Sequence, residues 1–476
     1  MLEWIKGVLA PRNRRPAAEE LYRLGEAEAL RRNNGAAEDL FRRAIALDAE
    51  RAQYHFGLGC VLQASGRLEA AADSYRRVLS LDGAFLPAML NLGSILQAAS
   101  EHAGSAESLF EEALALFRRV TEIAPGAPEG WINLGFVLER RARLREARAA
   151  YDRALALDPT LADARFNRSL VLLAQGEYRA GFEDYEFRWP ATGFPRPVFA
   201  APEWDGRPLG GQTVFLYTEQ GFGDAIQFVR YVALLARRGG RVLLRCQPEL
   251  RRMFEQVTGV AGVVAPDEVP PFDFHCSLLS LAGLLGTTID TIPAEVPYLR
   301  ADPQLVAAWR ERLREERRAL RVGLAWSSQS LMPNAAGKST TLEALAPLRD
   351  VPGVRYYSLQ VGSAGREAAA GLVPMTDLTA GIADFADTAA LVDNLDLVVS
   401  VDTAVAHLAG AMGRPVWTML RHAPDWRWYP DAAQSKWYPT MRLYRQRARG
   451  DWRGVAEEVA RDLRALAGRR AATSPT

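Results

Sequence analysis

Residues 213–224 read TVFLYTEQGFGD, a short apolar run followed by a polar step, two glycines and an aspartate. The apolar half predicts a buried strand, and Gly221 and Gly223 predict a tight turn that opens a helix from Asp224 to about Ala236. Further apolar runs alternate with helical segments behind it, at 241–246, 262–264 and 272–276. Such alternation is typical of a parallel sheet with helices on both faces, so the chain from residue 212 onward predicts an α/β fold.

A second unit of the same kind is predicted behind a charged helix at 304–318. Its expected strands lie at 321–326, 354–359, 397–401 and 415–420, with helices at 385–394 and 404–412. We expect a closing helix at 455–467 to pack back across the first unit, and the basic tail from Gly468 to be disordered. Because parallel sheets bind ligands at the carboxyl ends of their strands, two such units predict a cleft for two substrates.

The front third repeats itself every 34 residues, with units beginning near Ala18, Ala52, Leu86, Pro128 and Ala162. Side chains recur in phase: Leu-Gly pairs at 24–25, 58–59, 92–93 and 134–135, alanines at 37, 71 and 147, and aromatics at 41, 75, 151 and 185. The pattern resembles the tetratricopeptide repeat, an all-α solenoid of stacked helix pairs. The spacing between the third and fourth units is eight residues longer, which predicts an extended helix or an insertion near 100–108.

These patterns divide the chain into six expected segments. They are a leader at 1–17, a solenoid of about five helix pairs at 18–189, a Pro-rich linker at 190–211, one Rossmann-like domain at 212–303, a second at 304–446, and a C-terminal helix with a disordered tail at 447–476. The concave face of such a solenoid holds peptides, so we expect it to recruit a protein or peptide. A rigid spacer and a dimerisation surface are the alternatives.

Composition and charge exclude several classes of protein. The 476 residues carry a formal net charge of +1, whereas a general nucleic-acid binder shows a basic excess. The three cysteines, Cys60, Cys246 and Cys276, are scattered and odd in number, which fits a reducing compartment without disulfides or a metal site. The N-terminal arginines follow the apolar run, unlike a signal peptide, and we expect no transmembrane segment. A cytoplasmic protein is predicted, with a peripheral place at the inner membrane as the alternative.

The turn after the first strand is the first candidate site. Gly221 and Gly223 let the backbone approach a ligand, Glu219 and Gln220 precede them, and Asp224 opens the helix beside the expected cleft. The third glycine of a dinucleotide-binding loop is missing, which disfavours NAD. Asp224 is interpreted either as a site carboxylate or as a helix cap, and spacing does not separate the two readings.

The second candidate site is SVDTAVAHLAG at 400–410, where a buried strand ends in Asp402 and a helix begins. His407 lies one turn into that helix and can share the face of the turn, although a helical histidine is more often structural. The positive end of the helix suits a diphosphate, through the amides of Thr403, Ala404 and Val405.

Lys338 is the third candidate. It lies in NAAGKST at 334–340, which imitates a phosphate loop, but the first glycine that such a loop requires falls on Met332, so an ATPase P-loop is rejected. Lys338 either neutralises a phosphate or is a solvated surface lysine.

Two further segments contain residues that could bind a metal ion or a ligand. His275 and Cys276 are adjacent on a strand, so they point to opposite faces and make a poor metal pair. The Trp-rich segment 425–430, together with Trp437 and Tyr438, either stacks a base or a sugar or forms a packed loop, and we favour ligand contact.

Five motifs occur in order along the chain: TEQGFGDAIQF at 218–228, SLQ at 358–360, DFADTA at 384–389, VDTAVAHLAG at 401–410 and PDWRW at 424–428. Together they resemble bacterial tetratricopeptide-repeat glycosyltransferases related to the heptosyltransferases, over nearly the whole chain. The resemblance implies a GT-B fold, with two Rossmann-like domains facing a cleft. It also implies that the first domain takes the acceptor and the second a nucleotide-sugar donor. The implied enzyme is inverting and uses neither an essential metal nor a cofactor. Some relatives glycosylate flagellin, which they recognise through the repeats.

The resemblance also implies roles for particular residues. Gly223-Asp224 matches a Gly-Asp step whose aspartate is the proposed base, although Thr218 stands where the family often has glycine. Asp402-Thr403-Ala404 matches an Asp-Thr-Gly step that holds the donor, with alanine restricting the approach of the backbone. Lys338 matches a basic residue that meets phosphate. The donor side would also include Gln360, Val405 and His407.

We therefore predict transfer of a sugar to an acceptor hydroxyl, on a flagellin-like protein recruited by the repeats. Asp224 would accept the hydroxyl proton, while Lys338, His407 and the helix end at Thr403 stabilise the departing nucleotide diphosphate. This prediction requires the turns around 221 and 403 to face each other. The alternatives are a heptosyltransferase-like enzyme with a glycan or lipid acceptor, a non-catalytic repeat scaffold with a nucleotide-binding rear domain, and a sugar-nucleotide epimerase.

Overall fold

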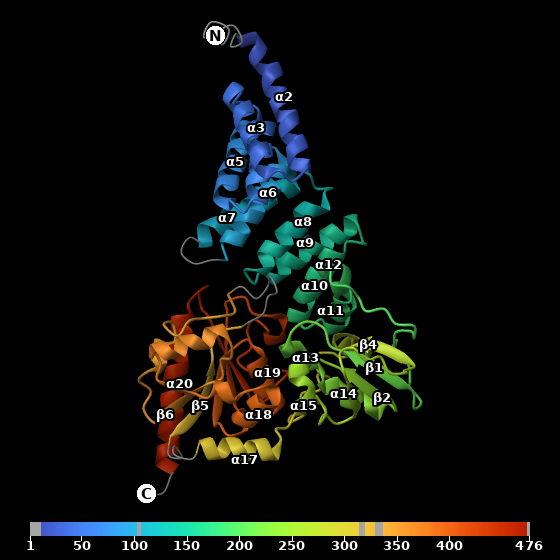
Figure 1. The fold of residues 1–476 in the computed structure, drawn as a ribbon, viewed down its shortest axis with the longest axis vertical. Coiled ribbons are helices and arrows are strands. Elements are labelled where there is room, and N and C mark those ends of the chain that lie inside the picture. Colours follow the sequence, from blue (N-terminus) through green and yellow to red (C-terminus); the bar gives the residue numbers. More distant parts are fainter. Residues whose placement is uncertain (1–10, 102–105, 314–318, 329–336, 474–476) are drawn as a thin grey trace. The chain divides into compact units, whose positions relative to one another are not determined.

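The computed structural model describes residues 11–101, 106–313, 319–328 and 337–473, and it divides into two compact units (Figure 1). The first unit ends at Ala164, and its helices pack in successive pairs. They are α2 (Pro11–Leu30), α3 (Asn34–Leu47), α4 (Ala52–Ala64), α5 (Leu68–Leu81), α6 (Leu86–Ala99), α7 (Ala106–Ile123), α8 (Pro128–Glu139) and α9 (Leu144–Leu157). The first helix begins at Pro11, ahead of Ala18, so part of the expected leader belongs to the first repeat.

The glycines and aromatics of the repeat meet inside each helix pair. A Cβ atom on Gly59 would lie 2.6 Å from Cε1 of Tyr75, and one on Gly135 would lie 2.7 Å from Cε1 of Tyr151. Real Cβ contacts do not come so close, so glycine is needed for α4 to lie against α5 and for α8 to lie against α9. The phased pattern therefore has a direct packing cause, which confirms the solenoid.

The extra residues of the third repeat lengthen its second helix. α6 has 14 residues, as α5 and α9 have, but α7 has 18. The aromatic ring that contacts Gly93 is that of Phe117, whereas the spacing of the other repeats predicts an aromatic at position 109. The insertion thus extends α7 without disturbing the contact between glycine and aromatic, and residues 102–105 lie outside the described part.

The second unit begins within α10 (Ala162–Ala174), continues through α11 (Tyr178–Tyr185) and α12 (Arg188–Thr192), and holds two parallel sheets. The first sheet has the order β3-β2-β1-β4, with β1 (Thr213–Tyr217), β2 (Arg241–Arg245), β3 (Val260–Val264) and β4 (Phe274–Ser277). Its helical elements are α13 (Phe222–Phe228), α14 (Arg230–Arg237), η1 (Pro248–Leu250), α15 (Arg251–Phe254), η2 (Leu278–Ser280) and α16 (Leu281–Leu284). The single helix predicted from Asp224 is wrong, because α13 and α14 meet at Val229.

The segment expected as a linker, 190–211, is folded against the first sheet. The amide of Trp204 donates to the carbonyl of His275 at 2.9 Å, and the amide of His275 donates to the carbonyl of Pro202 at 3.1 Å. Phe199 packs on Phe215 with ring centroids 5.5 Å apart, and Leu209 is fully buried. Proline ends the helical region as expected, but the chain then extends the edge of the sheet beside β4.

The second sheet has six parallel strands in the order β10-β9-β8-β5-β6-β7. They are β5 (Leu320–Ala325), β6 (Val354–Ser358), β7 (Met375–Asp377), β8 (Leu397–Val401), β9 (Val416–Leu420) and β10 (Met441–Arg445). Helical elements are α17 (Pro303–Arg312), η5 (Ala346–Leu348), η6 (Ser363–Ala370), η7 (Thr379–Gly381), α18 (Phe385–Asp393), α19 (Ala404–Ala411), η8 (Trp426–Trp428) and α20 (Trp452–Thr473). The four predicted strands are confirmed, whereas β7 and β10 were not predicted.

The last helix packs on the second sheet and not on the first. Val455, Val459 and Leu463 of α20 share a buried core with Val322 of β5 and Val399 of β8. The prediction that this helix packs across the first α/β domain, at 212–303, is therefore wrong. α20 also continues beyond Gly468 to Thr473, so the residues expected as the start of a disordered tail are helical.

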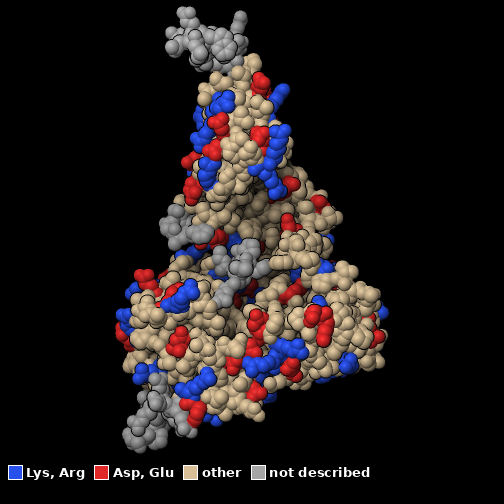
Figure 2. Space-filling view, viewed as in Figure 1, with Lys and Arg blue, Asp and Glu red and all other residues tan. Residues whose placement is uncertain are grey.

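A larger core joins both sheets of the second unit. It includes Leu216 of β1 and Val398 of β8, together with Tyr178 and Phe182 of α11. On the face shown in Figure 2, basic and acidic side chains are interspersed over the described surface. Among the described helices, we find none with the length and apolar character that a bilayer crossing requires.

Candidate functional site

The turn after β1 places Asp224 on the first turn of α13. Its Oδ2 accepts a hydrogen bond from the amide of Gly221 at 3.1 Å, so the capping role is real. Its Oδ1 lies 2.5 Å from Nη2 of Arg427, which belongs to η8, beyond the end of β9. The side chain is 22% exposed. Asp224 therefore combines the two readings that the sequence left open, a helix cap and a site carboxylate.

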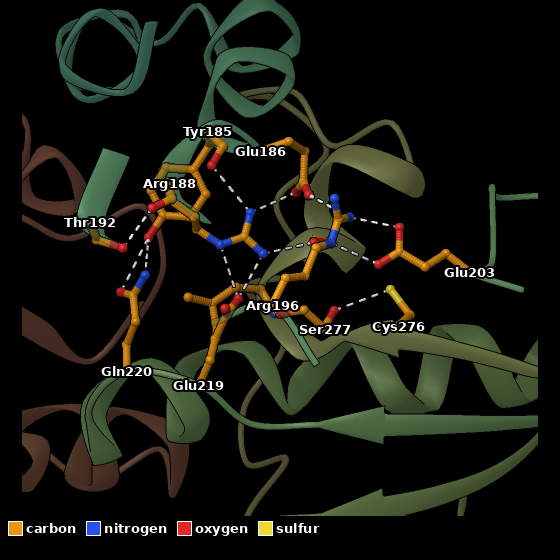
Figure 3. A network of polar contacts seen from close by, with 12 residues as sticks. Tyr185, Glu186, Arg188, Thr192, Arg196, Glu203, Glu219, Gln220, Cys276 and Ser277 are labelled. Atoms are coloured by element: carbon orange, nitrogen blue, oxygen red, sulfur yellow. Dashed lines mark hydrogen bonds and ion pairs between the residues drawn. The ribbon is translucent and has the colours of Figure 1, made fainter. Parts of the chain in front are cut away.

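Glu219 and Gln220 are held by the end of the helical repeats, as Figure 3 shows. The buried guanidinium of Arg188, on α12, donates to Glu219 at 2.7 Å and to the hydroxyl of Ser280 at 2.9 Å. The hydroxyl of Ser277 also donates to Glu219. Arg188 and Ser277 thus both bind Oε1 of Glu219, and this carboxylate anchors the loop.

Gln220 adopts a left-handed backbone conformation, with φ of 62°. This conformation is uncommon outside glycine, so the surrounding contacts must hold it. Nε2 of Gln220 donates to the Tyr185 hydroxyl at 3.2 Å, and the backbone carbonyl of Gln220 accepts from Nε2 of Gln247 at 3.2 Å. The turn is consequently fixed by α11 on one side and by the end of β2 on the other.

The turn after β8 places Asp402 beside Lys338. The Nζ atom of Lys338 lies 2.8 Å from Oδ2 of Asp402, and the two side chains are 15% and 10% exposed. The reading of Lys338 as a solvated surface lysine is therefore wrong. Residues 334–336 of the phosphate-loop-like segment, and Met332, lie outside the described residues.

Thr403 directly precedes α19, and its hydroxyl lies 2.9 Å from that of Ser400 and makes no cap hydrogen bond to the helix. Ala404 and Val405 follow on the first turn of the helix, where backbone amides lack partners within the helix. His407 is 6% exposed, with Nδ1 at 2.8 Å from the Tyr438 hydroxyl and Nε2 at 3.8 Å from Oδ1 of Asp402. The second turn therefore brings a cation, a carboxylate and a helix N-terminus together.

The two turns meet directly. A Cβ atom on Gly223 would lie 2.9 Å from Cδ2 of His407 and 3.7 Å from Cα of Ala404. Glycine at 223 is thus required for close approach of the two turns, which face each other as the sequence predicts.

A chain of ion pairs continues from one turn to the other. Nη1 of Arg427 lies 2.8 Å from Oδ1 of Asp425, and Oδ2 of Asp425 lies 3.9 Å from Nζ of Lys338. The order of charges is Asp224, Arg427, Asp425, Lys338 and Asp402. Carboxylates and cations alternate along it, so every charge has an opposite neighbour.

The environments of the carboxylates move their pKa values in opposite directions. Burial raises the pKa of Asp224, although Arg427 opposes the rise. Burial and Asp425 act to raise the pKa of Asp402, but Lys338 and His407 act in the opposite sense, and that pKa lies below its usual range. Burial lowers the pKa of His407 to about 3 against the pull of Asp402, so this imidazole is neutral near pH 7.

Gln360, expected on the donor side, faces the backbone of the neighbouring strand. Its side-chain oxygen accepts from the amides of Trp326 at 3.0 Å and Ser327 at 2.8 Å, and the side chain is buried. Gln360 thus fixes the chain as it leaves β5 toward Lys338.

The Trp-rich segment is packed, against our preference for ligand contact. Trp426, Trp428, Trp437 and Tyr438 are all buried. The ring of Trp428 lies 5.2 Å from that of His407, and Trp437 stacks on Tyr178 of α11 at 5.9 Å. These rings pack against the second turn on one side and against α11 on the other.

Asp425 and Arg427 were missed as site residues. The signal was present in the PDWRW motif at 424–428, where two charged side chains alternate with aromatics just after a predicted strand. The aromatic rings drew the interpretation toward stacking. Among the described residues, we find no cluster of three or more His, Cys, Asp or Glu side chains suited to a metal ion.

The fold and the site define a class of protein. A helical solenoid is followed by two parallel α/β sheets in a GT-B-like arrangement, with their turns in contact. Residues 363–440 match glycosyltransferase family 9 (heptosyltransferase), and residues 22–84, 56–128 and 128–161 match tetratricopeptide repeat families. The chain thus combines tetratricopeptide repeats with a glycosyltransferase family 9 domain.

Among curated proteins, the chain is similar to Protein FlbA of Caulobacter vibrioides. The two are 28% identical over 394 residues, which are 75% of this chain and 64% of FlbA, so the match spans less than two thirds of that relative. Solved structures with similarity include PilF of Pseudomonas aeruginosa (22% identity, TM-score 0.33, 39% of this chain and 79% of that one). Another is YrrB, a tetratricopeptide-repeat protein with an unusual peptide-binding site (20% identity, TM-score 0.32, 39% of this chain and 95% of that one).

Proposed function

We propose that this protein is a glycosyltransferase that moves a sugar from a nucleotide-activated donor to an acceptor hydroxyl. The observation that carries the proposal is the contact between the two turns, with Asp224 on one and Lys338 and the start of α19 on the other. The family 9 match at 363–440 includes the second turn, which supports the donor side.

The proposed reaction is a single displacement with inversion. The acceptor oxygen attacks the anomeric carbon, the bond from that carbon to the diphosphate oxygen breaks, and the acceptor proton passes to Asp224. The nucleoside diphosphate leaves as an anion. The raised pKa of Asp224 makes its carboxylate a better proton acceptor than an ordinary surface aspartate.

The leaving diphosphate would be stabilised by the chain's own groups. Lys338 supplies the positive charge, and the amides of Thr403, Ala404 and Val405 point from the positive end of α19. His407 is neutral, so its contribution would be a hydrogen bond and packing. We therefore propose a reaction without a metal ion or a cofactor.

Asp224 is a better candidate for the base than Glu219, the other carboxylate of the same turn. Glu219 accepts from Arg188 and from Ser277, and its side chain is 11% exposed. Its Oε1 atom is therefore committed to holding the loop. Asp224 is more exposed and keeps acceptor positions beyond its bonds to Gly221 and Arg427.

The acceptor is proposed to be a protein, recruited by the concave face of the repeats in the cytoplasm. Tetratricopeptide solenoids bind peptide segments on that face, which supports a protein acceptor over a small glycan or a lipid. A flagellin-like protein is the acceptor that the sequence resemblance favours.

The purified full chain tests this function. A panel of UDP-, GDP-, CMP- and dTDP-sugars is incubated with the protein and a cell extract, and nucleotide release and sugar attachment to protein are measured. Donor cleavage by the wild-type chain that is lost in Asp224→Ala, with nucleotide binding retained, supports the enzyme. Nucleotide binding without cleavage of any donor would instead indicate a scaffold.

A further inference from the structure

Arg427 makes directed contacts with three separate side chains. Nη2 reaches Oδ1 of Asp224 at 2.5 Å, Nη1 reaches Oδ1 of Asp425 at 2.8 Å, and Nε donates to the side-chain oxygen of Gln227. The guanidinium lies 4.5 Å from the ring centre of Trp426, and the side chain is 7% exposed. Asp224 and Gln227 belong to α13, so Arg427 ties η8 to that helix.

We infer that Arg427 is a positioning residue that orients Asp224 and keeps it ionised, and that Asp425 links it to Lys338 on the donor side. This inference rests on the proposed function, because Arg427 acts through Asp224, the proposed base. A planar guanidinium suits the task, since its donors have fixed directions and its charge is permanent.

The geometry fixes the carboxylate of Asp224 at both oxygens. The Gly221 amide holds Oδ2 and Arg427 holds Oδ1, so rotation of the carboxylate would break one bond or the other. An ionised carboxylate has about four acceptor positions. Those that remain are therefore presented in a set direction, toward the acceptor hydroxyl in the proposed reaction.

The surroundings of Asp224 require a cation. Burial alone favours the protonated carboxyl, and the nearby carboxylate of Asp425 acts in the same sense. Arg427 and Lys338 act in the opposite sense, and Arg427 does so most strongly. The other facing groups are the Tyr185 phenol and the neutral His407. Arg427 thus supplies most of the charge that lets Asp224 act as a base near neutral pH.

Arg427 is poorly placed to bind the diphosphate itself. Its Nε, Nη1 and Nη2 atoms already donate to Gln227, Asp425 and Asp224. Lys338 is the cation beside the start of α19, and Asp425 contacts it from the side of Arg427. A division of labour follows, in which Arg427 serves the base and Lys338 serves the leaving group.

The test compares Arg427→Gln and Arg427→Lys with Arg188→Gln in the full chain. Arg188 is the matched control because it is also buried and also pairs with a carboxylate of the first turn, Glu219. Nucleotide release from the cleaved donor of the panel is followed across pH 5 to 9, and kcat and KM are separated.

We expect Arg427→Gln to move the acidic limb of the kcat profile about 1 to 3 pH units higher, because the cation no longer favours the ionised carboxylate. Its KM for the donor should stay near that of the wild type. The acidic limb of Arg427→Lys should lie between those of the wild type and Arg427→Gln. Lysine keeps the positive charge but lacks the several directed donors of the guanidinium. Arg188→Gln should lower the melting temperature without moving the limb. An unmoved limb in both Arg427 variants would overturn the inference, as would an equal shift in Arg188→Gln.

A second measurement does not depend on turnover. In Arg427→Gln, melting temperature should fall relative to the wild type as pH rises from 5 to 8, because Asp224 becomes ionised without its partner. Adding Asp224→Asn should remove that pH dependence. If the wild type cleaves no donor, the proposed function fails. The melting experiment still tests whether Arg427 keeps Asp224 ionised. A pH-independent loss in Arg427→Gln would contradict the inference.

Discussion

The turns after β1 and after β8 are built alike but surround their aspartates differently. Each follows a buried parallel strand and opens a helix, α13 in one case and α19 in the other. Asp224 pairs with a guanidinium and has a raised pKa, whereas Asp402 pairs with the Lys338 ammonium and has a lowered pKa. Two aspartates that follow interior strands of the two sheets therefore have pKa values shifted in opposite directions.

The two α/β halves of one fold can therefore carry out different steps of one reaction. Carboxylates whose environments push their pKa values apart are suited to different roles. Asp224 is suited to accept a proton, while Asp402 stays ionised and holds Lys338 in place. The comparison becomes a set of experiments, in which changes to each turn should damage different steps.

The largest effect is expected from Asp224→Asn. Asparagine keeps the shape and can still accept from Arg427, but it cannot take a proton at neutral pH. Loss of a general base costs about 10²- to 10⁴-fold in kcat. Nucleotide release and calorimetric binding of the nucleoside diphosphate measure the two steps. A variant that retains full kcat, or that loses nucleotide binding to the same extent, would break the assignment.

Lys338→Met should act on the other turn. It removes the cation beside α19 and leaves Asp402 without its closest partner. Removing one preorganised donor to a developing anion costs about 10²- to 10³-fold in kcat. Affinity for the nucleoside diphosphate should fall as well, unlike in Asp224→Asn. Calorimetry in parallel on both variants checks this contrast, and unchanged affinity in Lys338→Met would exclude Lys338 from the donor site.

Gly223→Ala tests the contact between the two turns. The added methyl would lie 2.9 Å from His407, so one turn must shift. Overpacking of this kind costs about 1 to 3 kcal/mol of unfolding free energy. Gly262→Ala is the control, because its methyl would meet its nearest neighbour at an ordinary 3.6 Å. Equal urea midpoints and equal kcat for the two variants would show that the turns do not meet.

The smallest effect is expected from His407→Gln, in the pH dependence of stability. A histidine with a folded-state pKa of about 3 and an unfolded pKa of about 6.5 favours unfolding as pH falls below 6.5. Between pH 7 and pH 5 the wild type should lose about 2 kcal/mol through this group, and the variant should not. Urea titrations at both pH values give the difference. An equal change in the free energy of unfolding for both chains would mean that folding does not shift the pKa of His407.

Much of the fold was predictable because its signals are local or repeated. The Leu-Gly and aromatic positions of the solenoid recur in phase, and each has a packing cause such as Gly59 under Tyr75. The interior strands of both sheets are mostly apolar, as is typical of strands buried on both faces. In contrast, β10 and β7 are the two edge strands of the second sheet. β10 has arginines at two of its five positions, and β7 spans three residues. Such short or edge strands carry too little pattern to be recognised.

The aspartates of the site could be located from the sequence, but their partners could not. A strand followed by a glycine turn and a helix marks Asp224 and Asp402 with their immediate neighbours. Arg427 meets Asp224 across 203 positions of sequence, and Arg188 meets Glu219 from the end of the repeats. Local sequence patterns do not show which residues of such distant segments come into contact. The burial of the Trp-rich segment is likewise decided by α11, which packs on it from far away in the sequence.

The central claim is that the turns at 221–224 and 402–405 form one site, with the base on one and the anion cradle on the other. A crystal structure of the full chain with the cleaved donor's nucleoside diphosphate tests it most directly. We expect the terminal phosphate within hydrogen-bond distance of Lys338 and the amides of Ala404 and Val405, with the Asp224 carboxylate facing the position that the sugar would occupy. A diphosphate bound away from α19, or an Asp224 carboxylate turned away from it, would show that the two turns do not form one site.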